Sequence, residues 1–224
     1  MLMKKIGTIF SAVAAVALSA VMLVACSSVS DRVVHGADGD STVALLTVYA
    51  TGERGKVAPL LAAAGHAYCS VTNISDDTII LGKGYELAAG TTVTIASWEF
   101  DAHGGIWYNI EPTYIDQGWF VKRKSITRGV DTDALRRMNE YLTDDDNDRW
   151  TLFHNCTHFA AEFWNAAAKG SGDEIDTKGM LTPSDLEKQV KRFQGYEIGR
   201  PHVSSMPIGY YSGGEFVEFE LVNQ

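Results

Sequence analysis

The stretch WTLFHNCTHFAAEFWN, residues 150–165, carries the strongest local signals in the chain. Asn155 is a favoured helix N-cap residue, and the residues after it are rich in Ala and contain no Pro or Gly before Gly170. This pattern predicts a helix that begins at Cys156 and runs to about Lys169. Gly170 is expected to end it.

Cys156 opens this predicted helix and shares one stripe with Ala160, Phe163 and Ala167, so its thiol is expected to point inward from the first turn. Unpaired backbone N–H groups and the positive end of the helix dipole stabilise a thiolate there, which lowers the pKa of a cysteine and makes its sulfur nucleophilic. Cysteine is also a common small core residue, and that interpretation stays open. A nucleophile needs a base, so a partner histidine decides between the two.

The amino terminus, MLMKKIGTIFSAVAAVALSAVMLVACSS, has two lysines, a long apolar run and the sequence LVAC at 23–26. It resembles the lipobox of bacterial lipoproteins. The resemblance implies a signal peptide at 1–25, a lipid anchor on Cys26, a tether at 26–41 and one domain at 42–224. The mature protein would then be anchored by lipid on the extracytoplasmic side of the membrane. A plain secretory peptide and an uncleaved anchor helix are the alternatives.

The chain is acidic, with a formal charge of −9 that becomes about −11 once residues 1–25, with Lys4 and Lys5 and no acid, are removed. An acidic surface argues against binding nucleic acid or anionic lipid head groups. Neutral or mixed-charge substrates, such as peptides and glycopeptides, fit this charge better. No Gly-rich phosphate loop is present, and we expect no cofactor.

Two cysteines, Cys69 and Cys156, remain in the mature domain, which is too few for a disulfide scaffold and matches no zinc motif. Cys69 lies three residues after His66 on a predicted strand, so the two side chains point to opposite faces. We therefore expect Cys69 to be a structural thiol that is not bonded to Cys156.

The remaining patterns predict an α+β domain in which an antiparallel sheet packs against the helix that carries the nucleophile. The strands are expected to form a meander, with residues 78–81 returning as the hairpin partner of 66–73. Strands are expected at 43–50, 66–73, 78–81, 91–97, 106–110, 119–124 and 215–222, and helices at 57–64, 131–142, 156–169 and from 182 onward.

The acidic run at 144–148, DDDND, has the alternating carboxylates of a calcium loop. It lacks the turn Gly of that loop, and Asn155 stands where the bidentate Glu belongs. The run is therefore interpreted as a solvated loop, and no metal site is expected.

Six histidines are candidates for the base, and geometry removes some of them. His158 lies about 200° round the helix from Cys156, since each residue turns the helix by about 100°. His35 falls in the tether, and His154 precedes the cap. His66, His103 and His202 remain.

GHAY at 65–68 followed by NCTHF at 155–159 resembles the circularly permuted branch of the papain-like superfamily, which includes NlpC-type peptidase relatives and lecithin:retinol acyltransferase-like enzymes. In that branch the histidine strand precedes the cysteine helix. The resemblance covers residues 65–165 approximately. It implies that Cys156 is the nucleophile and His66 the base.

His202 is the alternative base, and it would give the unpermuted order. His66 is preferred because HAYCSVTN alternates cleanly, whereas Pro207 interrupts the segment that follows His202. The third member of the triad is open among His103, Asn109 and Glu111, with His103 slightly preferred.

Three functions follow from these patterns. The first is a lipid-anchored thiol hydrolase that cleaves amide bonds of peptidoglycan stem peptides. The second is acyl transfer or deacylation of lipids through a thioester on Cys156. The third is a binding lipoprotein that has lost activity and whose aromatic side chains line a groove, namely Trp98, Trp107, Tyr108, Tyr114 and Trp119.

Overall fold

The computed structural model describes residues 35–36, 41–52, 65–118, 120, 123–179, 182–193, 197–198 and 206–221. The chain divides into two compact units, Met1–Val33 and Val34–Gln224, and the described elements all belong to the second. The predicted signal peptide, the Cys26 anchor, the helix expected at 57–64, Trp119 and the alternative base His202 lie outside the described residues. Within the described ranges, no helix has the length and apolar character needed to cross a membrane.

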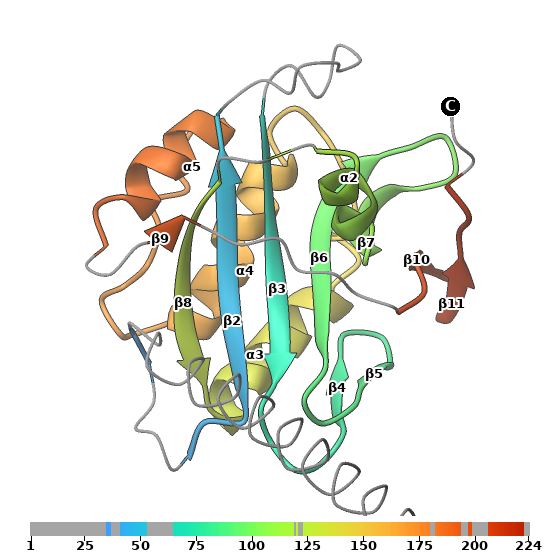
Figure 1. Cartoon of the computed structure of the whole chain (residues 1–224), viewed down its shortest axis with the longest axis horizontal. Helices are drawn as coiled ribbons and strands as arrows, with labels where there is room; N and C mark the ends of the chain where they lie inside the picture. The colour runs from blue at the N-terminus through green and yellow to red at the C-terminus, as the bar shows by residue number, and fades with distance from the viewer. Residues whose placement is uncertain are drawn as a thin grey trace, which may run out of the picture. The chain divides into compact units, whose positions relative to one another are not determined.

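Along the second unit the strands β1 to β7 come first, then α2 and β8, then the helices α3 to α5, and the strands β9 to β11 come last (Figure 1). The strands are β1 (His35–Gly36), β2 (Ala44–Thr51), β3 (His66–Asn73), β4 (Ile79–Leu81), β5 (Tyr85–Leu87), β6 (Thr92–Glu99), β7 (Gly104–Tyr108), β8 (Lys124–Val130), β9 (Glu197–Ile198), β10 (Gly209–Ser212) and β11 (Glu215–Glu218). The helices are α2 (Glu111–Asp116), α3 (Thr132–Thr143), α4 (Cys156–Ala168) and α5 (Pro183–Val190).

The main sheet has the strand order β1-β8-β2-β3-β6-β7-β10-β11, with β9 added beside β8. Its long central pairs, β8 with β2, β2 with β3 and β3 with β6, are antiparallel, whereas the short β1 runs parallel to β8. The fold is therefore α+β with a largely antiparallel sheet.

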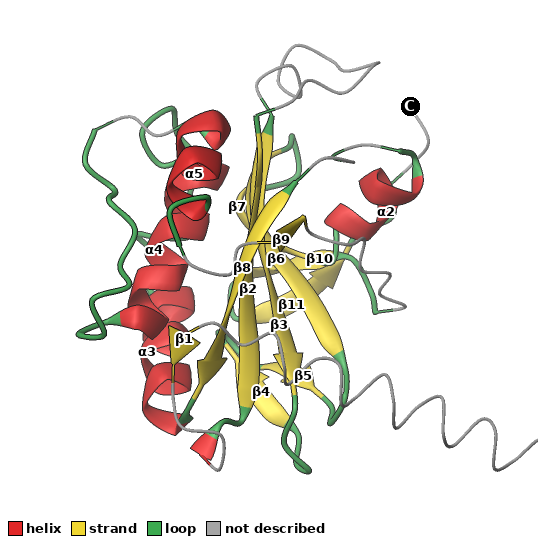
Figure 2. Ribbon diagram, turned by 60° about the vertical axis from the view of Figure 1, so that its left-hand side comes forward, coloured by secondary structure: helices red, strands yellow, loops and turns green. Residues whose placement is uncertain are grey.

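Helices α3, α4 and α5 cover one face of the sheet, and α2 lies beyond the other (Figure 2). Alternation along β3 separates the faces: Ala67 and Cys69 join the large core with α4, whereas Tyr68 belongs to a small cluster with Ile115 of α2. The Ala-rich, Phe-rich stripe of α4 is buried against the sheet in the large core. This packing also brings the first turn of α4 to the end of the sheet where β3 begins (Figure 1).

Several predicted elements are confirmed. Strand 66–73 and the helix from Cys156 have the expected bounds to within a residue, and Asn155 caps α4 by accepting hydrogen bonds from the N–H groups of Thr157 and His158. The helix expected at 131–142 is α3, capped by Asp131. The helix expected from residue 182 is α5, whose cap is a reciprocal Thr182–Asp185 pair.

The hairpin predicted for residues 78–81 is wrong, because β4 pairs with β5 in a separate two-stranded sheet. Gly82 and Gly84 both have positive φ, which lets the chain reverse at once after Leu81. The Asn73 side chain donates hydrogen bonds to the carbonyl oxygens of Asp77 and Leu87, and so closes this excursion at its base.

The strand predicted at 119–124 is also wrong. Phe120 has φ +56°, which is not strand geometry, and the strand runs from Lys124 to Val130 instead. Because β8 then pairs with β2, the sheet is not a simple meander. The strand predicted at 215–222 ends at Glu218, and its partner β10 was not expected.

Candidate active site

Cys156 is the first residue of α4, and its side chain is partly exposed at the end of the sheet. The stripe below it is buried as predicted, since Ala160, Phe163 and Ala167 all belong to the core. The Thr157 hydroxyl lies 3.9 Å from the sulfur. The N-cap and this packing hold the thiol at the positive end of the helix.

His66 is the first residue of β3, and its side chain is 3% exposed. Gly65 places it there: it has φ +85°, and a Cβ at that position would collide with the carbonyl oxygen of Thr51 and lie 3.1 Å from the Cβ of Pro183. Only glycine fits this close approach between the ends of β2 and β3 and the start of α5. The histidine position is therefore set by the backbone on either side of it.

Cys156 and His66 interact directly. Burial by itself would lower the pKa of His66, but the charge of Cys156 and hydrogen bonds with Cys156 and Glu111 raise that pKa to about 9. Burial would likewise raise the pKa of Cys156, but the His66 charge, its hydrogen bond and the N–H of Ala67 lower it below its ordinary value. The two shifts favour a thiolate–imidazolium pair near neutral pH.

Glu111 is the third member of this group. It opens α2, is fully buried, and its Oε1 lies 3.3 Å from His66 Nε2. The same oxygen accepts a hydrogen bond of 2.7 Å from Trp98 Nε1. Since Nε2 faces Glu111, Nδ1 is the ring nitrogen that serves Cys156. The other oxygen, Oε2, has no hydrogen-bond partner among the described residues.

Aromatic rings enclose the imidazole. The ring centroid of His66 lies 4.1 Å from that of Trp98, 4.9 Å from Phe120 and 5.8 Å from Tyr68. Tyr114 stacks on the outer side of Trp98 at 5.2 Å. These rings keep water away from the histidine, which strengthens its interactions with both charged neighbours.

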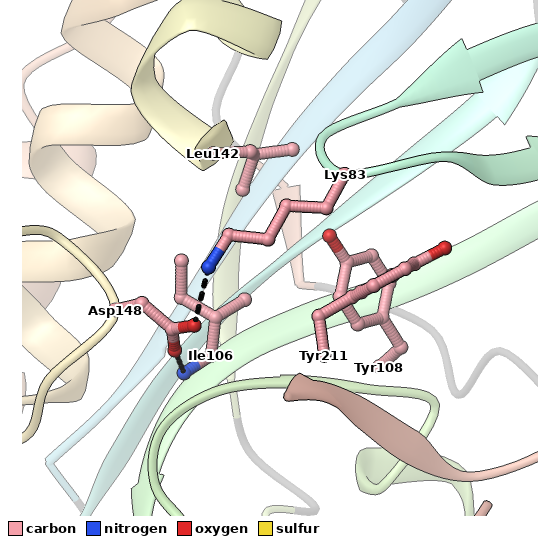
Figure 3. Close-up of a pocket in the computed structure, with 6 residues that line it drawn as sticks. All are labelled: Lys83, Ile106, Tyr108, Leu142, Asp148 and Tyr211. Carbon is pink, nitrogen blue, oxygen red and sulfur yellow. Dashed lines mark hydrogen bonds and ion pairs between the residues drawn. The ribbon is translucent and has the colours of Figure 1, made fainter. Parts of the chain in front are cut away.

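His103, the preferred third member from the sequence, is not part of this group, and that preference is corrected. Its Nε2 pairs with Asp148 Oδ1 at 2.9 Å, and its ring stacks on Tyr210. Asp148 also receives hydrogen bonds from Lys83 and from the N–H of Ile106 (Figure 3). The acidic run is therefore not wholly solvated, because its last carboxylate fastens the loop to the β6–β7 hairpin.

The pocket drawn in Figure 3 does not belong to the candidate site, because none of its lining residues contributes to the Cys156 group. The pocket is lined by Lys83, Ile106, Tyr108, Leu142, Asp148 and Tyr211. Lys83 reaches across the pocket and donates a hydrogen bond to the Asp148 carboxylate. The pocket has no space for a water-sized ligand.

The other sequence candidates have structural contacts. Asn109, with φ +60°, accepts a hydrogen bond from the N–H of Thr94 and donates to the Tyr85 hydroxyl. His158 faces the carbonyl oxygen of Gly179 at 2.9 Å, on the side of α4 away from the thiol, as the helical spacing predicted. These contacts give neither residue a role at Cys156.

Cys69 and Cys156 are both free, as predicted. Cys69 is fully buried under α4, and its thiol donates to the carbonyl oxygen of Ala160 at 3.7 Å. Burial raises the pKa of Cys69 well above its ordinary value. It is an inert core thiol.

Of the aromatic residues proposed to line a groove, Trp107 and Tyr108 are buried in the core, whereas Trp98 and Tyr114 are partly exposed near His66. Among the residues that the structure describes, no cluster of three or more His, Cys, Asp or Glu side chains is arranged to hold a metal ion. Comparison of the chain with protein-family models, with curated proteins and with solved structures gave no match.

Proposed function

We propose that the protein is a thiol hydrolase that cleaves amide bonds of peptides through an acyl-enzyme, with Cys156 as nucleophile, His66 as acid and base, and Glu111 as the group that orients His66. The observation that carries this proposal is the convergence of the three side chains from α4, β3 and α2 with opposite pKa shifts on Cys156 and His66. Perturbed pKa values that come from burial together with a specific charged partner cluster at functional sites.

In the first half-reaction the Cys156 thiolate attacks the carbonyl carbon, and a C–S bond forms as the carbonyl oxygen takes the negative charge. The backbone N–H of Cys156, which the Asn155 cap does not use, stabilises that oxyanion at the start of α4. His66, which is protonated, gives its Nδ1 proton to the leaving nitrogen as the C–N bond breaks. The amine departs, and a thioester on Cys156 remains.

In the second half-reaction the now neutral His66 takes a proton from water, which attacks the thioester. The C–S bond breaks, the thiolate is restored, and the product leaves as a carboxylic acid. His66 is again an imidazolium, so the cycle closes without a cofactor.

Glu111 contributes by holding the tautomer and the charge of His66. Its carboxylate faces Nε2, so the Nε2–H bond points to Glu111 while Nδ1 serves the sulfur. Trp98 fixes Glu111 in turn, through the hydrogen bond to Oε1. A protein that only binds a ligand has no need to bury a carboxylate behind a histidine, and this disfavours the binding lipoprotein.

The order of the site residues along the chain, histidine strand first and cysteine helix later, supports a permuted papain-like topology. The lipobox-like segment supports a location outside the cytoplasm with Cys26 lipidated. Peptidoglycan stem peptides are therefore the first substrate class to test. For the anchor itself, Cys26→Ser should release the protein from membranes or block its processing, whereas continued attachment after cleavage at the same place would exclude a lipid on Cys26.

The decisive experiment measures the alkylation rate of Cys156 by iodoacetamide against pH, together with turnover of peptide substrates. In the wild type, the thiolate should form well below its ordinary pKa. His66→Ala should move thiolate formation to higher pH and reduce turnover by roughly 10² or more. Cys156→Ala should abolish turnover and leave the fold intact.

Cys69→Ala is the matched control, because it removes a buried thiol on the same sheet that has no contact with His66. It should change neither the pH dependence of alkylation nor turnover. An ordinary pKa for Cys156 in the wild type would leave it as a core residue and refute the hydrolase.

A further inference from the structure

Two large apolar side chains are exposed in the turn that comes just before the nucleophile in the chain. Leu152 is 69% exposed and Phe153 is 72% exposed, and they lie four and three residues before Cys156, respectively. Single exposed apolar residues are common, but two adjacent ones at this exposure are not needed for folding. Their place next to the thiol calls for a ligand.

These two side chains form the corner of a closed turn. The N–H of Thr151 donates to the carbonyl oxygen of His154 at 3.0 Å, and the N–H of His154 donates back to the carbonyl oxygen of Thr151 at 3.2 Å. Gly, Asn, Asp, Ser and Pro dominate such corners because they adopt the backbone conformations of turns or form hydrogen bonds with the local backbone. Leu and Phe offer neither advantage, so their presence is better explained by what they contact.

The turn is fixed relative to Cys156. Asn155, whose Oδ1 caps α4, donates from Nδ2 to the carbonyl oxygen of Leu152 at 3.1 Å. On the other side, His154 pairs with Glu162 of α4 at 3.4 Å, and its Nδ1 lies 2.9 Å from the carbonyl oxygen of Arg149. The backbone that carries the apolar pair is therefore hydrogen-bonded to the residue that caps α4, and this preorganisation lowers the entropy cost of binding a group there.

The apolar surface at this end of the sheet is small. Across the described residues, the other exposed large apolar side chains are Ile74 and Ile80, both 44% exposed. Ile74 follows the last residue of β3, and Ile80 lies in β4. Both are therefore at the opposite end of β3 from His66. Two side chains match one amino-acid side chain in area, whereas a long acyl chain needs a continuous apolar channel.

We propose that Leu152 and Phe153 determine substrate specificity by binding a bulky apolar side chain of the residue next to the scissile amide bond. This inference rests on the proposed function. Among peptide substrates, it predicts a preference for residues such as Leu or Phe next to the scissile bond over residues whose side chains are small or charged.

The test uses alkylation of Cys156 in the full-length protein, so that it does not depend on finding a substrate. Four reagents are compared: iodoacetamide and the chloroacetyl derivatives of glycine amide, of phenylalanine amide and of octylamine. The phenylalanine reagent should react with the wild type about tenfold faster than the glycine reagent, because covering an aromatic side chain gives roughly one factor of ten in binding.

The double variant Leu152→Ser and Phe153→Ser should lose this preference and keep its rate with iodoacetamide. Ile80→Ser is the matched control, because it removes an exposed apolar side chain far from the turn, and it should keep the preference. The melting temperature of each variant shows that the fold is intact.

Each other outcome has one meaning. Fast iodoacetamide alkylation with equal glycine and phenylalanine rates overturns the specificity inference and leaves the hydrolase standing. A preference that persists in the double variant, or one for the octyl reagent alone, also overturns it, the latter in favour of an acyl chain. Slow alkylation by every reagent refutes the proposed function itself.

Discussion

Glu111→Gln is the substitution that best separates a catalytic triad from a buried ion pair. Glutamine keeps the volume of the side chain and the oxygen that accepts from Trp98, but it removes the negative charge that faces His66 Nε2. The fold should therefore survive while the electrostatics of the site change. The apparent pKa values of both Cys156 and His66 should therefore change.

The size of the effect follows from the pKa of His66. The rise from 6.5 to about 9 corresponds to about 3 kcal/mol in favour of the imidazolium, since one pKa unit is about 1.4 kcal/mol. Cys156 contributes more to this rise than Glu111 does. Loss of the carboxylate charge should thus remove about 1 kcal/mol, and kcat/KM near neutral pH should fall about fivefold.

The assay is the pH dependence of kcat/KM with a fluorogenic peptide. In the wild type, activity should rise as Cys156 ionises, below the ordinary cysteine pKa, and fall as His66 loses its proton near pH 9. In Glu111→Gln the imidazolium is less stabilised, so the pKa of His66 falls and the alkaline limb should move to lower pH. The thiolate loses part of its counter-charge, so the acidic limb should move to higher pH.

A bell that narrows from both sides is the result that the triad requires. If kcat/KM falls at every pH while both limbs of its pH profile stay in place, Glu111 acts only through packing. Trp98→Phe is the matched comparison, because it removes the hydrogen bond to Glu111 and keeps an aromatic ring beside His66. It should narrow the bell less than Glu111→Gln does.

Three further predictions concern folding and thiol chemistry. Gly65→Ala should lower the free energy of unfolding by about 2 kcal/mol or more in urea titrations, because of its positive φ and the collision of the new Cβ. Mass spectrometry should find iodoacetamide on Cys156 in the folded protein, and on Cys69 only after unfolding. The hydrogen bond with Glu162 raises the pKa of His154, so this pair stabilises the fold below the ordinary histidine pKa and loses its effect as pH rises through the raised value. Glu162→Gln should therefore lower the melting temperature slightly near about pH 6 and hardly at all near about pH 9.

The parts of the fold that were predictable from the sequence are those set by local patterns. The cap at Asn155, the uninterrupted stripe after it and the alternation of HAYCSVTN define α4 and β3 without any knowledge of their neighbours. Cys156 and His66, the proposed nucleophile and base, are the first residues of these two elements, so their positions in the fold were also predictable.

Strand order was not predictable in the same way, because it depends on contacts between distant segments. KSITRGV at 124–130 carries β-branched residues but also contains Arg128 and Gly129, and the neighbouring aromatic residues favoured a strand at 119–124 instead. Pairing of β8 with β2 determines where this strand lies, and that pairing joins residues about eighty positions apart.

Glu111 shows what local signals do offer for the third member of the triad. Pro112 follows it directly, which is typical of the first turn of a helix, and an acid there is favoured by the helix dipole. These signals predict α2, but not the direction in which the carboxylate points. His103 was slightly preferred from the sequence, but its partner is Asp148, in an acidic run that the sequence presents as solvated.

The strand β6 explains how three separate elements come to share one site. It pairs with β3, so Trp98 lies beside the first residue of that strand, His66, and it continues into the hairpin to which the loop before α4 is tied. The tie consists of the His103–Asp148 pair and the hydrogen bond from the N–H of Trp150 to the carbonyl oxygen of Gly104. One strand therefore places the histidine, orients Glu111 through Trp98 and anchors the approach to Cys156. Loosening the hairpin should reduce activity without touching a catalytic atom.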